Sequence, residues 1–103
     1  MPGDVYRFSF NEAQPFDEVL DTLDLAVMAV QSLHGLERVR LDARFVSDPN
    51  RRTLVIDAAT AVGQGLCQIF LGYARREFGE RAFEVQRIER EREAEQMEPA
   101  AAA

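Results

Sequence analysis

Two aspartates in the middle of this 103-residue sequence could do chemistry together, because the predicted fold brings them onto neighbouring strands. A tight turn centred on Pro49 and Asn50 would place Asp42 directly opposite Asp57. Two facing carboxylates would hold a cation, share a proton as a catalytic dyad does, or be relieved by arginines on diagonal positions. A register shifted by two residues would instead pair Asp57 with Arg40 in an ordinary salt bridge. Two carboxylates alone supply few ligands for a metal ion. We therefore favour a structural role for Asp42 and Asp57, and we expect neither a metal site nor a catalytic centre.

Thr60, Gly63 and Gly65 mark the passage from a predicted strand into a predicted helix. Free backbone N–H groups at such a helix start can bind a phosphate. The segment lacks the third glycine of the dinucleotide-binding pattern and the Lys-Ser/Thr of a phosphate loop. We therefore favour an interpretation in which the glycines allow close packing. An anion- or nucleotide-binding site formed with Arg40 and Arg44 remains the alternative.

The sequence contains one cysteine and one histidine, Cys67 and His34. A catalytic thiol or a histidine base needs a positioned partner, and neither residue has one nearby in sequence. One cysteine forms neither an internal disulfide nor a thiolate metal cluster. We expect structural roles for both residues, and no cofactor.

The chain is acidic, with 18 acidic residues against 12 basic ones and a formal net charge of -6. All of the basic residues are arginine. This balance argues against binding to DNA, RNA or an anionic membrane through general electrostatics. No basic-then-apolar leader and no apolar run near 18 residues appear, so we expect a soluble cytoplasmic protein.

Hydrophobic periodicity predicts six elements. Strands are expected over 5–10, 38–46, 53–58 and 82–88, and helices over 16–34 and 62–78, with Thr60 as an N-cap and Gly35 and Gly79 as helix stops. This β-α-β-β-α-β order predicts an α+β ferredoxin-like sandwich, in which two helices cover one face of a four-stranded, mostly antiparallel sheet. Residues 1–88 would form the single domain. Residues 89–103 are charged and alanine-rich, which predicts a frayed helix or a disordered tail.

The uncovered face of this sheet is predicted to gather four arginines. They are Arg7, Arg38, Arg40 and Arg44. RNA-binding sheets of this kind stack bases on exposed aromatic side chains, but every strand aromatic here has inward parity. We therefore expect this face to interact with protein and not with nucleic acid.

The helix over 16–34 is apolar on more than one side around Leu25, Met28 and Ala29. Such a helix end leaves an apolar patch that a partner can cover. With Arg7 and Arg38, these residues form the predicted interaction surface. The sequence thus favours a small non-catalytic domain for self-association or for docking to another protein within a larger assembly. An enzyme built on Asp42 and Asp57 is the least favoured function.

Overall fold

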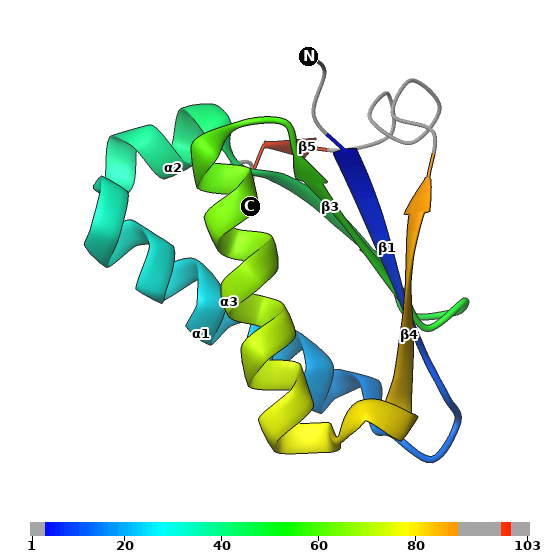
Figure 1. Cartoon of the computed structure of the whole chain (residues 1–103). Helices are drawn as coiled ribbons and strands as arrows, with labels where there is room; N and C mark the ends of the chain where they lie inside the picture. Colours follow the sequence, from blue (N-terminus) through cyan, green and yellow to red (C-terminus); the bar gives the residue numbers. More distant parts are fainter. Residues whose placement is uncertain (1–3, 89–97, 100–103) are drawn as a thin grey trace.

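The computed structural model of the chain describes residues 4–88 and 98–99 (Figure 1). The elements are β1 (Asp4–Phe10), α1 (Phe16–His34), α2 (Leu36–Asp42), β2 (Arg44–Asp48), β3 (Thr53–Ala58), α3 (Ala61–Phe78), the short 3-10 helix η1 (Glu80–Ala82), β4 (Phe83–Ile88) and the two-residue β5 (Glu98–Pro99). The helices form a layer against one face of the sheet. Among the described residues, no helix is long and apolar enough to cross a membrane.

The strands lie in the order β4-β1-β3-β2-β5, and all neighbouring pairs are antiparallel. The predicted α+β class with a four-stranded antiparallel sheet is therefore confirmed, with β5 as a two-residue addition at one edge. The chain has three α-helices in its described part, where two were expected. Except for β5, the predicted tail lies outside the described residues.

The core fills the space between the sheet and the helices. Phe8 and Phe70 are both fully buried, and their rings meet edge to face with centroids 5.0 Å apart. Helix α1 contributes residues at helical spacing, among them Val19, Leu23 and Val30. This is the amphipathic pattern that the sequence predicts, and it fixes which side of each helix faces away from the core.

The strand predicted over 38–46 is wrong in its first half, because Leu36–Asp42 form helix α2. Gly35 adopts a φ of 90°, which glycine reaches without strain, so the chain turns after α1 and starts a new helix at once. Val39 is the one buried residue of this helix, and Arg38 forms an ion pair with Asp42 across one turn, at 3.0 Å between Nε and Oδ2. Strand β2 begins only at Arg44.

The β2–β3 hairpin has a different register from the predicted one. Asp48 pairs with Thr53, so the loop contains four residues, and Arg44 stands opposite Asp57. Val55 and Asp57 lie on the sheet face away from the helices, yet they are only 5% and 4% accessible. Their strand β3 is central, and Val55 packs with the fully buried Val5 in a second small apolar cluster on the sheet face away from the helices.

Candidate interaction surface

The two aspartates singled out in the sequence lie on different elements and do not form a facing pair. Asp42 is the last residue of α2 and pairs with Arg38. Asp57 lies on β3, where it accepts a hydrogen bond from the Ala59 N–H at 2.8 Å and faces Arg44 across the hairpin. The facing-carboxylate hypothesis fails because the register differs and residues 36–42 are helical. Within the described ranges, no three His, Cys, Asp or Glu residues are grouped to hold a metal ion.

At the start of α3, a backbone N–H group that could bind a ligand is already hydrogen-bonded within the protein. The Thr60 hydroxyl accepts a hydrogen bond from the Gly63 N–H at 3.0 Å and donates one to the Asp42 carbonyl oxygen, also at 3.0 Å. Thr60 is therefore the N-cap that the sequence predicts. A Cβ atom on Gly63 would lie 2.1 Å from the Asp57 carbonyl oxygen, which supports the packing interpretation for this glycine.

Gly65 has more room, since a Cβ atom there would come no nearer than 3.8 Å to the His34 Nε2 atom. The two arginines of the alternative anion site are both exposed, but Arg40 lies on α2 and Arg44 on β2. The predicted ligand site is thus divided among three elements, with one of its amides already bonded.

The expected row of four arginines on the sheet is also wrong. Arg38 and Arg40 project from α2, because their segment is helical. Arg7 and Arg44 remain on strands, on the side away from the helices. Arg7 donates a hydrogen bond from Nη2 to the Gln86 Oε1 atom at 3.0 Å. The sheet face away from the helices therefore holds two of the four arginines, and at least one of them is hydrogen-bonded to its neighbouring strand.

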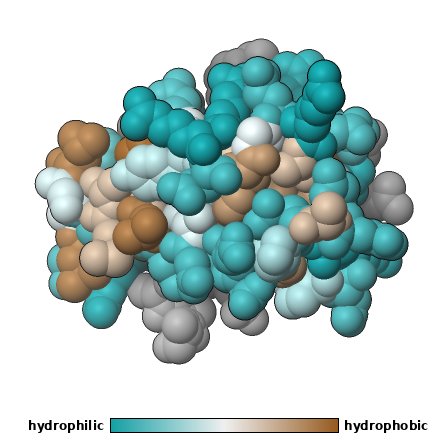
Figure 2. Space-filling model, turned by 90° about the horizontal axis from the view of Figure 1, so that it is seen from below, coloured by the Kyte–Doolittle hydropathy of each residue, from teal (hydrophilic) through white to brown (hydrophobic). Residues whose placement is uncertain are grey.

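The most unusual surface lies on α1 and α2. Five large apolar side chains there are between 47% and 73% exposed. This α1–α2 surface comprises Leu25, Met28, Leu33, Leu36 and Leu41. Figure 2 shows apolar groups gathered at the left, the side on which Figure 1 places the helices. The predicted members Leu25 and Met28 belong to this surface, whereas Ala29 is half-buried and Arg7 lies on the sheet.

Leu33, Leu36 and Leu41 were not predicted as surface residues. They line a shallow hollow at the corner where α1 meets α2, together with Glu37 and Arg38. The 73% exposure of Leu41 follows from the helical conformation of its segment. Nothing in the sequence distinguished these leucines from core residues, because leucine is among the residues most often buried.

Cys67 and His34 lie on different helices, α3 and α1, and line different hollows. Burial raises the pKa of the Cys67 thiol to about 11, so the side chain is a neutral thiol at pH 7 and a poor nucleophile. His34 is exposed at the end of α1 and lines the corner hollow. The Cys67 thiol is therefore not an activated nucleophile.

The structure thus defines a small α+β domain whose helical layer carries an exposed apolar surface. Comparisons of this chain with protein-family models, with curated proteins and with solved structures found no match.

Proposed function

We propose that this chain is a small protein–protein interaction domain that self-associates through the α1–α2 surface, within a larger cytoplasmic assembly. The observation that carries this proposal is the exposure of five large apolar side chains on two consecutive helices. Burying such a side chain completely is worth about 1.5–3 kcal/mol, so half-exposed leucines leave a large unused stabilisation. In a chain of only 103 residues, a second copy supplies the apolar surface that the small core lacks.

A second copy fits this surface by symmetry and by charge. In a two-fold dimer the same patch is used by both partners, so apolar residues meet apolar residues. Glu37 and Arg38 line the same hollow as the leucines. A two-fold arrangement can set Glu37 of one copy against Arg38 of the other, which gives the interface a polar and complementary rim.

The positions of the candidate catalytic groups support a non-catalytic role. Asp42 and Asp57 do not share a site, and the Cys67 thiol is protonated at neutral pH. Arg40, Arg44 and the Thr60–Gly65 segment lie on separate elements. This separation makes the alternative function, anion or nucleotide binding, the weaker proposal.

We further propose that the fold is a ferredoxin-like sandwich in which α2 is an addition between α1 and β2. In the order β4-β1-β3-β2, strands β1 and β2 enclose β3, and strands β3 and β4 enclose β1. Two interleaved β-α-β units of this kind make up the split arrangement of that fold. An added α2 also accounts for the position of the apolar surface, because the end of α1 and the added helix together line the hollow that contains Leu33, Leu36 and Leu41.

The test is the mass of the purified chain in solution, measured by light scattering over a range of concentrations. The wild-type chain is expected to show twice its monomer mass of 11.6 kDa. The double variant Leu33→Gln, Leu41→Gln should be monomeric, because it places amides in the interface. Val85→Gln is the matched control, since Val85 is 40% exposed but lies on β4. A wild-type chain that stays monomeric near millimolar concentration overturns self-association.

A further inference from the structure

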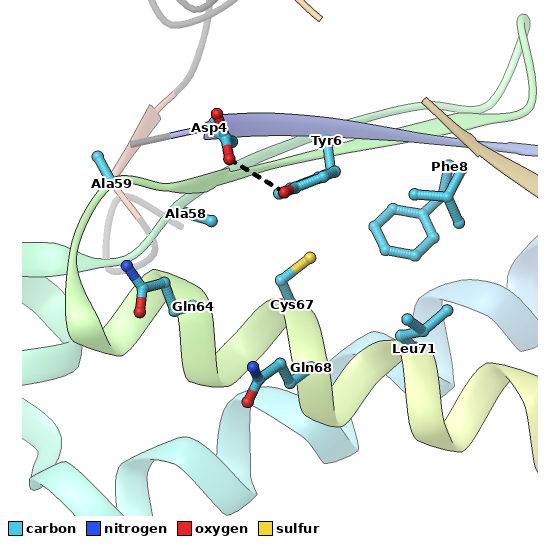
Figure 3. Close-up of a pocket in the computed structure, with 10 residues that line it drawn as sticks. Asp4, Tyr6, Phe8, Ala58, Ala59, Gln64, Cys67, Gln68 and Leu71 are labelled. Atoms are coloured by element: carbon cyan, nitrogen blue, oxygen red, sulfur yellow. Dashed lines mark hydrogen bonds between the residues drawn. The ribbon is translucent and has the colours of Figure 1, made fainter. Parts of the chain in front are cut away.

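A cavity of about 540 Å³ opens between α3 and the β1–β4 side of the sheet, away from the α1–α2 surface (Figure 3). Its walls come from β1, the end of β3, α3 and β4. The lining residues are Asp4, Tyr6, Phe8, Ala58, Ala59, Gln64, Cys67, Gln68, Leu71 and Val85. Sites for small molecules usually enclose about 300–1,000 Å³, so this volume suits one small ligand.

The two ends of the cavity differ in polarity. Figure 3 shows Asp4, the Tyr6 hydroxyl and Gln64 toward one end, and Phe8 and Leu71 toward the other. The Tyr6 hydroxyl donates a hydrogen bond to the Asp4 Oδ2 atom at 3.1 Å. The Cys67 Sγ atom points toward the sheet between these ends. A ligand that matches this lining has an apolar body and one polar group at its end.

The charge of the lining restricts that polar group. Asp4 is the one charged residue among the ten that line the cavity. Its hydrogen bond raises the pKa of Tyr6, since loss of the phenol proton beside a carboxylate is unfavourable. Arg87 approaches the Asp4 Oδ1 atom at 3.6 Å, but its side chain is 69% exposed and screens that charge only weakly. A carboxylate head would therefore be repelled, and an amine or hydroxyl head accepted.

We propose that this cavity binds a small amphiphile whose apolar body packs against Phe8, Leu71 and Val85 and whose amine or hydroxyl head lies near Asp4 and Tyr6. The polar gradient, the volume and the single carboxylate together carry this assignment. The argument for this site shares no residue with the argument for self-association, because none of the lining residues belongs to the α1–α2 surface.

Three probes with the same indole body and different heads test the proposal, namely tryptamine, tryptophol and indole-3-propionate. Binding to the full chain is measured by titration calorimetry. It is measured independently by protection of Cys67, the only cysteine in the sequence, from a thiol reagent. Tryptamine and tryptophol are expected to bind and to slow the labelling. Tryptamine should bind about fivefold more tightly than indole-3-propionate, because reversing one charge near a partly exposed carboxylate is worth about 1 kcal/mol.

Two variants and one control connect the result to the site. Val85→Trp fills the apolar end and should abolish binding, whereas the control Glu84→Trp introduces the same side chain on the opposite face of β4 and should preserve binding. Asp4→Asn should bring the affinities of tryptamine and indole-3-propionate within about twofold of each other. Failure of all three probes to bind at millimolar concentration overturns the proposal. Preferential binding of indole-3-propionate, or unchanged binding in Val85→Trp, also overturns it.

Discussion

Alanine substitutions at three glycines of α3 should change stability in opposite directions, although all three lie on one helix. In the middle of a helix, replacing glycine with alanine stabilises by about 1 kcal/mol, because alanine loses less backbone entropy on folding. A Cβ atom on Gly72 would meet no other part of the structure within 4 Å, and one on Gly65 would meet its nearest neighbour at 3.8 Å. Gly72→Ala and Gly65→Ala should therefore each raise the free energy of unfolding by roughly 0.5–1 kcal/mol.

Gly63→Ala should have the opposite effect, because its new methyl group would lie 2.1 Å from the Asp57 carbonyl oxygen. Both groups are attached to backbone, so no side-chain rotation relieves the contact. Overpacking of this kind costs about 1–3 kcal/mol. A shift of the helix start also weakens the Thr60 cap on the Gly63 N–H, worth about 1 kcal/mol. We expect a net loss of about 1–3 kcal/mol after the gain in helix propensity is subtracted, a large part of the stability of a domain this size.

The assay is urea unfolding followed by circular dichroism. With a slope of about 1–3 kcal/mol per molar urea, Gly63→Ala should lower the midpoint by roughly 1 M. The Gly72→Ala midpoint should lie above that of the wild type. A Gly63→Ala variant as stable as the Gly72→Ala variant would refute the close approach of α3 to the end of β3.

Two further predictions concern a loop arginine and the buried thiol. Arg52 has a φ of 58° and donates from its guanidinium to the carbonyl oxygens of Asn11 and Gln14. Arg52→Ala should lower the free energy of unfolding by about 2 kcal/mol, and Arg52→Gly should lower it by less, because glycine accepts this φ without strain. Equal losses for the two variants in urea unfolding would contradict the role assigned to the positive φ. Because the pKa of Cys67 is raised to about 11, its thiolate fraction in the folded chain should keep rising beyond pH 9 and level off only above pH 11. The labelling rate of the folded chain should follow that rise. The labelling rate of the chain unfolded in urea should level off at a lower pH, set by the ordinary thiol pKa of about 8.5. Equal pH profiles of the labelling rate for the two states would show that the thiol is not desolvated.

The long helices and strand β1 were predictable because the spacing of their apolar residues fits only one type of secondary structure. Helices α1 and α3 repeat apolar residues at helical spacing and end at Gly35 and Gly79, both of which have positive φ values. Strand β1 alternates over most of its length. Such patterns extend over several turns or strand positions, so an incorrect assignment would expose many apolar side chains.

The segment that contains α2 was not predictable in this way. Val39 and Ala43 are four residues apart, a spacing that places both on one face of a helix and also on one face of a strand. The helix needs only Val39 as a buried anchor, and it is seven residues long. Because Arg38, Arg40 and Asp42 belong to this segment, the same ambiguity led to the incorrect arginine row and carboxylate pair. The exposed leucines and the cavity depend on tertiary packing that no local pattern contains.

One hydroxyl group links the two surfaces that this fold presents. Thr60 bonds the last carbonyl of α2 and the first turn of α3 at the same time. Helix α2 carries Leu36 and Leu41, and one turn after Thr60 the next helix supplies Gln64 to the cavity. Displacement of α2 by a docked partner would therefore strain the start of α3, and a ligand beside Gln64 would in turn bias the position of α2. Under the two proposals made above, thermodynamic reciprocity requires the coupling through Thr60 to be equal in free energy in both directions.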